Sequence, residues 1–276
     1  MTLTKEHLAL SASTIDRPRP RPPLVERRWV GVAAPLALVV VILVAWEITS
    51  KFVNPVLISS PPKAAHALFE AFRRGSIADA VGVSLRELFI GLGIGVVGGL
   101  LLGVLIGRYR LFDAVASPFV NTAIATPLPI LIPLMILWVG VTVKARILFI
   151  AISTLIPVLL NTAGGVRNVS QGYADVGRSL GLSERQTVWK IVAPATAPYI
   201  FAGLRLGLAH SVIAMIIVEM EVSQVGVGFL LSQYGASLDM SSLISVTLLV
   251  CLLGVALVGI LLGIERRWFA WIRAAR

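Results

Sequence analysis

The sequence predicts an all-α integral membrane protein with six transmembrane helices. Hydrophobic residues make up 57% of the 276 residues and charged residues 14%, against about 45–50% and about 25% in soluble domains. This apolar surface exceeds what one globular core could bury. Six segments also approach the roughly 20 apolar residues that cross a bilayer. They are residues 30–50, 88–106, 119–138, 147–162, 199–218 and 243–264.

The residues before the first span predict a disordered basic tail. Residues 1–28 are polar and rich in proline and arginine, with RPRPRPP at residues 17–23, a composition typical of disorder. The first apolar run lacks a small-residue cleavage site and is longer than a signal h-region of about 7–15 residues. We therefore expect a cytoplasmic tail over residues 1–28 and a six-span domain over residues 29–276.

A short external helix is predicted between the first two spans. Pro61 and Pro62 precede residues 63–74, in which Leu68 and Phe72 fall on one side at helical spacing. We expect this helix to pack on the outer surface.

Glycines recur at every fourth position of the second span. Small residues at this spacing form a flat stripe that another helix can approach closely. Packing within the chain is favoured over a dimer seam. The glycines are Gly91, Gly95, Gly99, Gly103 and Gly107.

Three prolines interrupt the third span. Pro127, Pro129 and Pro133 remove helical hydrogen-bond donors, and membranes tolerate such breaks where neighbouring helices or a cavity satisfy the backbone. The pattern predicts a kink, either beside a translocation path or with a purely structural role.

Residues 173–194, YADVGRSLGLSERQTVWKIVAP, form a polar island between two apolar runs. Ser170 is expected to cap a first short helix, on which Val176 and Leu180 share a face. Gly181 is the residue type that ends a helix in a left-handed conformation. The chain is therefore expected to turn at Gly181.

A second short helix is predicted directly after this turn. Ser183 and Gln186 have the spacing of a capping box, and Val188 and Trp189 begin an apolar side that Pro194 is expected to end. The island thus predicts two short helices joined at a glycine elbow.

The basic residues set the orientation. Six spans place both termini on one side, and the segments on that side hold more than twice as many Lys and Arg residues as the opposite segments. Because such residues accumulate in cytoplasmic segments, both termini and the island are expected in the cytoplasm. The net charge of +10 is explained by this bias, so nucleic-acid binding is not expected.

The chain offers no chemistry of its own. Cys251 is its single cysteine, and His7, His66 and His210 fall in different compartments, so neither a metal site nor a catalytic group is expected. No G-x-x-x-x-G-K-[ST] phosphate loop occurs. We expect a protein that is not an enzyme and that holds no cofactor.

The island resembles the EAA loop of inner-membrane permease subunits of binding-protein-dependent ABC importers, whose pattern is E-A-A-x3-G-x9-I-x-L-P. Here Asp175, Val176 and Gly177 occupy the first three positions, and Gly181 occupies the glycine position of that pattern. Ile191, Ala193 and Pro194 complete it. The resemblance extends to three further segments, PLPILIPLMILWVG, NTAGGVRNV and GVGFLL. Together these segments resemble the subgroup of permeases that imports sulfonates, taurine or nitrate.

The resemblance implies a type I permease fold in the bacterial inner membrane, with a coupling loop at about residues 168–197. It implies three kinds of partner: two ATPase subunits that bind ATP and Mg, a second permease subunit, and an external solute-binding protein. The second permease subunit would be another copy of this chain, forming a homodimer. The solute would be a small anion such as a sulfonate, taurine or nitrate. The coupling residues would be Asp175, Val176, Gly177, Leu180, Gly181, Val188, Trp189, Ile191 and Pro194.

Polar groups and prolines within the spans predict the translocation path. Intramembrane ionisable residues usually serve function, which makes His210 and Glu219 candidates. Pro129 and Pro133 are the candidates from the kinked third span. A neutral imidazole that bonds a neighbour is the alternative for His210. A proton-coupled secondary transporter is the alternative function, although repeated halves are not found.

Overall fold

The structure is a computed structural model that describes residues 28–54 and 56–268, with the side chains of residues 28–32, 170–176, 178, 184 and 189 outside the described set. The predicted disordered tail over residues 1–28 therefore lies almost wholly outside the described residues. The chain divides into two units, residues 1–52 and 53–276, and each is described by itself.

The first unit contributes one helix, α2 (Arg28–Phe52). Its segment Ala33–Phe52 is long and apolar enough to cross a membrane. Leu36, Val41 and Ile42 are more than half exposed, as expected of side chains that face lipid. This helix corresponds to the first predicted span.

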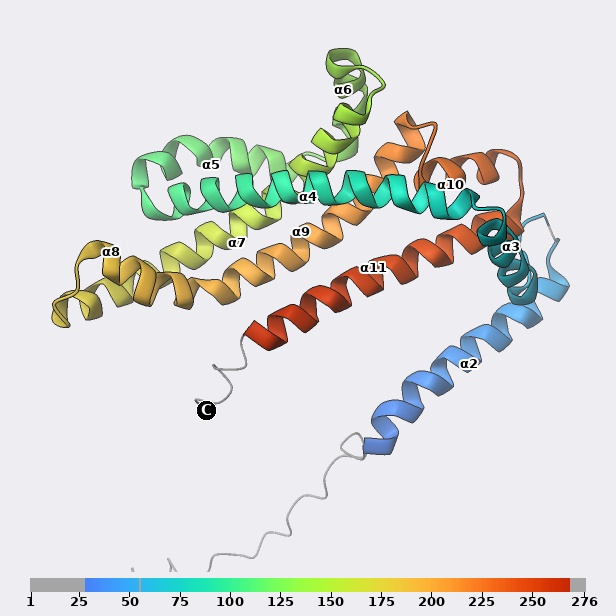
Figure 1. Cartoon of the computed structure of the whole chain (residues 1–276), viewed down its shortest axis with the longest axis horizontal. Helices are drawn as coiled ribbons and strands as arrows, with labels where there is room; N and C mark the ends of the chain where they lie inside the picture. Colours follow the sequence, from blue (N-terminus) through green and yellow to red (C-terminus); the bar gives the residue numbers. More distant parts are fainter. Residues whose placement is uncertain (1–27, 55, 269–276) are drawn as a thin grey trace, which may run out of the picture. The chain divides into compact units, whose positions relative to one another are not determined.

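Helices are the only regular secondary structure among the described residues of the second unit (Figure 1). Four of its helices carry continuous spans, and the short helix predicted after Pro61 and Pro62 is present as α3. The elements are α3 (Pro61–Arg73), α4 (Ser76–Arg108), α5 (Arg110–Ala125), η2 (Leu128–Leu131), α6 (Ile132–Val139), α7 (Val143–Ser179), α8 (Glu184–Thr187), η3 (Val188–Val192), α9 (Ala193–Val222), α10 (Val227–Ala236) and α11 (Met240–Trp268).

The third predicted span is not one continuous helix. The chain bends by 99° between α5 and the segment Leu128–Val139, and Figure 1 shows α6 standing across the direction of α5. Pro127 and Pro129 leave α5 without donors for another helical turn. The described chain therefore has five single-helix spans, and six when the bent pair counts as one.

Helices α4 and α7 pack along the glycine stripe, as predicted for contact within the chain. A Cβ on Gly95 would lie 2.5 Å from the Ala151 carbonyl oxygen, and one on Gly103 would lie 2.7 Å from the Thr162 Cβ. Each of the five stripe glycines meets α7 in this way. Only the absence of a side chain lets the two backbones approach so closely.

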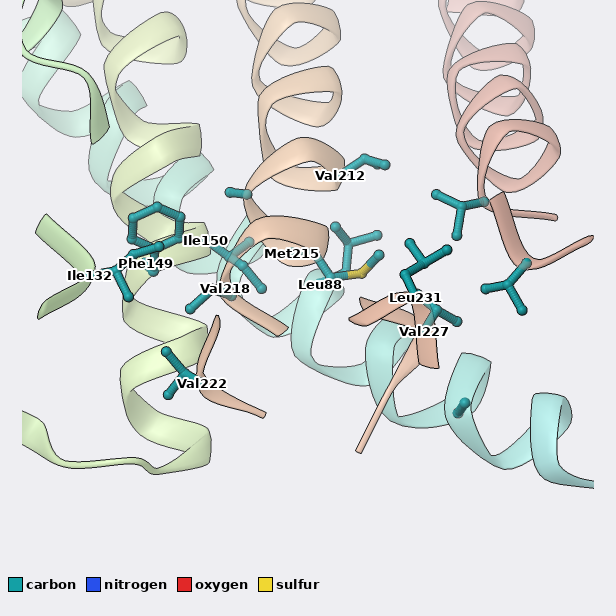
Figure 2. Packing of buried hydrophobic residues seen from close by; sticks show 14 of the residues in the cluster. Leu88, Ile132, Phe149, Ile150, Val212, Met215, Val218, Val222, Val227 and Leu231 are labelled. Atoms are coloured by element: carbon teal, nitrogen blue, oxygen red, sulfur yellow. The ribbon is translucent and has the colours of Figure 1, made fainter. Parts of the chain in front are cut away.

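The apolar core lies between α4, α6, α7, α9, α10 and α11. Figure 2 shows Phe149, Met215 and Leu88 directed into it, and each is at most 2% exposed. Since a membrane span gains little from apolar burial as such, close packing of these side chains is what holds the helices together.

Candidate functional site

Helix α7 ends in an elbow at Gly181. Gly181 has φ +66°, and the Leu182 amide donates to the Gly177 carbonyl oxygen at 3.0 Å. This bond across six residues, closed by a left-handed residue, is a Schellman motif. The predicted glycine elbow is confirmed.

The capping box after the elbow is also confirmed. The Ser183 amide donates to Gln186 Oε1 at 3.1 Å, and the Gln186 amide donates to Ser183 Oγ at 3.3 Å. Thr187 then packs directly against Gly177, where an added Cβ would clash with its side chain. The elbow is therefore fixed both at its turn and between its two arms.

Two details of the predicted elbow are wrong. No separate helix begins at Ser170, because α7 runs unbroken from Val143 to Ser179 with no proline after Pro157. Pro194 also does not end a helix. A π-helical turn (Val188–Val192) precedes it, and the Ala193 amide donates to the Val188 carbonyl oxygen. Pro194 then lies in the first turn of α9, which continues the helical path directly from the π-helical turn.

The elbow exposes apolar side chains. Leu180 is 66% exposed and Val188 38% exposed, while Ile191 and Pro194 are half-buried. Asp175 and Val176 lie in α7 and Trp189 in η3, but their side chains are outside the described set. The described part of the elbow thus combines a rigid backbone with an uncovered apolar surface.

At the opposite end of the helices, a buried ion pair joins α4 to α7. Arg146 donates from Nε to Glu87 Oε2 at 2.7 Å and from Nη2 to Oε1 at 2.5 Å. Glu87 is 3% and Arg146 5% exposed. The bidentate geometry offsets the desolvation of both charges.

Glu219 lies in a buried network with α4 and α10. Its Oε2 accepts hydrogen bonds from Ser84 Oγ at 2.9 Å and the Gly228 amide at 2.8 Å, and the Val227 amide donates to Ser84 Oγ at 2.9 Å. Glu219 is fully buried. Gly226 has φ +98°, and a Cβ there would lie 2.5 Å from the carboxylate. The network therefore fixes the N-terminus of α10.

A cavity of about 430 Å³ lies between the end of α5, η2, α7 and α9. Its wall is mainly apolar, and its polar groups come from Thr126, Ser153, Asn161 and His210. Pro129 also lines it. The structure thus brings together two of the four path candidates, Pro129 and His210.

The other two candidates lie elsewhere. Pro133 is exposed in α6, and Glu219 is enclosed in the α10 network. The ion pair of Glu87 and Arg146 was not among the sequence candidates, since its partners are 59 positions apart. Glu87 and Arg146 each directly precede a predicted span, and this shared position was the available signal.

Comparison with known protein families places the chain. Residues 95–270 match the family described as "Binding-protein-dependent transport system inner membrane component". A crystal structure of an amino acid ABC transporter with histidines superposes with a TM-score of 0.60 at 18% identity, over 72% of this chain and 97% of that chain. That likeness supports the helical fold.

Curated relatives are similar over most of their length. The nitrate import permease protein NrtB of Synechocystis sp. is 30% identical, over 84% of this chain and 85% of NrtB. The aliphatic sulfonates transport permease protein SsuC of Escherichia coli is 29% identical, over 89% and 94%. The taurine transport system permease protein TauC of Escherichia coli is 24% identical, over 85% and 87%.

Proposed function

This chain belongs to the family of binding-protein-dependent transport system inner membrane components, and we propose that it forms the translocation path of an ATP-driven importer. Two copies of the chain would enclose the path as a homodimer. An external solute-binding protein delivers the solute to one side, and two ATPase subunits act on the other. The chain itself makes and breaks no bonds.

The elbow is the observation that carries this proposal. Its turn is fixed by Gly181 and by the capping box of Ser183 and Gln186, while Leu180 and Val188 remain exposed. A rigid loop with an uncovered apolar surface suits docking into a cleft of an ATPase subunit. ATP and Mg are bound by that subunit, and the coupling contacts include Asp175, Val176, Trp189, Ile191 and Pro194. The buried Gly177 supports the elbow by letting Thr187 pack against it.

The charge distribution supports a cytoplasmic position for the elbow. Arg108, Arg167, Arg185, Lys190 and Arg266 all lie at the elbow end of the helices, and basic residues accumulate on the cytoplasmic side. With six spans, both termini then lie in the cytoplasm. Glu87, Arg146 and α10 lie at the external end.

We place the solute path along the cavity beside α9, with Pro129 and His210 at its wall. Pro133 supports the bend before α6, and Glu219 holds α10 at the external end. The names of the relatives guide the solute class, which is a small sulfonate, taurine or nitrate.

The elbow is tested by Gly181→Val in the chain co-expressed with its ATPase subunit. A β-branched residue at φ +66° is strained, so the variant should insert normally yet lose solute-driven ATP hydrolysis and uptake. Gly164→Val in α7 is the matched control, because a Cβ at Gly164 meets nothing within 4 Å.

Two outcomes would contradict the proposal. Gly181→Val could transport as well as the unmodified chain, in which case the elbow is not used for coupling. Uptake could also follow a proton gradient, with no ATPase subunit in the purified complex. That second result would identify a secondary transporter.

A further inference from the structure

The cavity between α5, η2, α7 and α9 contains polar groups that the helices do not use. The His210 ring is exposed within α9 and hydrogen-bonds no described residue. The hydroxyl of Ser153, a buried residue of α7, also hydrogen-bonds no described residue. Asn161 donates one amide N–H to the Pro157 carbonyl oxygen at 2.8 Å, which leaves its other N–H and its oxygen free.

Prolines add backbone acceptors to the same wall. In a regular helix the Ala123 carbonyl would accept from residue 127 and the Ser153 carbonyl from residue 157, but both of those residues are prolines. Ala123 and Ser153 both line the cavity. Backbone groups without partners at membrane depth are tolerated where they line a water-filled space. The cavity is therefore richer in acceptors than in donors.

No formal charge balances a bare anion in this cavity. Among the described residues of its wall, none is Lys, Arg, Asp or Glu, and His210 is the only imidazole. A net negative solute would therefore lose hydration without gaining a counter-charge. A solute that neutralises its own charge and carries N–H donors avoids that cost.

We propose that this cavity is a solute-binding site for a small zwitterion, such as an aminoalkanesulfonate, rather than for an acceptor-only anion such as nitrate. Its ammonium group donates to the carbonyl oxygens of Ala123 and Ser153. Its anionic oxygens accept from His210, Asn161 and the Ser153 hydroxyl. This proposal rests on the proposed function, because it names the solute that crosses along the path.

Thiol labelling tests the cavity without any need for ATP hydrolysis. Ile213 lines the cavity and is 56% exposed. The variant Ile213→Cys is made in a Cys251→Ser background and labelled in membrane vesicles that hold the full chain. Methanethiosulfonate reagents with an ethylammonium or an ethylsulfonate group are compared, each normalised to its rate with a free thiol. The ammonium reagent should react about tenfold faster, a ratio that one or two hydrogen bonds supply.

Ile260→Cys in the same background is the matched control. Ile260 lies in α11, is 62% exposed and is not part of the cavity wall. It should show no such preference between the two reagents. An equal or reversed ratio at position 213, or no reaction there with either reagent, overturns the proposal.

Protection by solute provides the second readout. 2-Aminoethanesulfonate should slow the labelling of Ile213→Cys at concentrations about tenfold lower than ethanesulfonate or nitrate. His210→Leu should weaken this protection about fivefold, while His210→Gln, which keeps an N–H donor, should largely retain it. Equal protection by all three solutes contradicts the proposal. A negative result in the Gly181→Val experiment would instead contradict the coupling to an ATPase subunit, and it would leave the labelling and protection ratios unaffected.

Discussion

Gly95→Ala is predicted to destabilise the pairing of α4 with α7. The added Cβ would lie 2.5 Å from both the Ala151 carbonyl oxygen and the Thr154 Cβ, whereas carbon atoms in contact are separated by about 3.5–4.0 Å. The two helices must therefore separate by about 1 Å at this point. Both obstructing atoms are held by the backbone, so no side-chain rotation relieves the clash.

The expected loss follows from overpacking. Extra atoms in a close-packed site cost about 1–3 kcal/mol, and separating the helices also weakens the contacts at Gly91 and Gly99. The higher helix propensity of alanine returns at most about 1 kcal/mol. We expect a net loss of about 1–2 kcal/mol in the free energy of unfolding.

Gly93→Ala is the matched control, since a Cβ at Gly93 meets nothing within 4 Å. It makes the same chemical change two residues away in α4 and should be neutral or slightly stabilising. Unfolding of both variants in mixed detergent micelles, titrated with sodium dodecyl sulfate, measures the difference. Equal midpoints for the two variants would refute the close approach of α4 and α7.

The remaining predictions concern the buried polar groups. Glu87→Ala leaves Arg146 charged and unpaired, so it should cost about 3–5 kcal/mol of stability in the same titration. The double variant with Arg146→Met should recover most of that loss, and additive losses would contradict a direct pair. Glu219→Ala removes the acceptor of Ser84 and of the Gly228 amide, at about 1–3 kcal/mol for each buried donor, and should speed proteolysis at α10. Glu219→Gln keeps an acceptor and should be milder; equal cleavage of both variants would argue against the network.

Local features of the elbow could be predicted from the sequence. Gly181 and the box of Ser183 and Gln186 act within a few residues, so their chemistry is readable without the rest of the fold. The prediction that Pro194 ends a helix was wrong because a π-helical turn precedes it and the helical path continues through the proline. That turn is visible only in the backbone. Proline position alone does not reveal whether a chain stops or adjusts.

Features that depend on distant contacts were harder to predict. The prolines of the third span predicted a kink, but the 99° bend depends on how η2 and α6 pack. Glu219 was assigned to the path because a carboxylate in a span suggests function, whereas its partner Ser84 is 135 positions away. Its burial follows from that tertiary contact.

The length of α7 links places that were described separately. Its 37 residues extend over about 55 Å at 1.5 Å per residue, and they include Arg146 near one end, Ser153 at the cavity and Gly177 at the elbow. A single continuous helix has a fixed length along its axis, so a force applied at the elbow tilts or shifts the whole rod. Under the proposed function, mechanical work delivered at the elbow would therefore reach the cavity and the far ion pair through α7, whose one internal proline is Pro157.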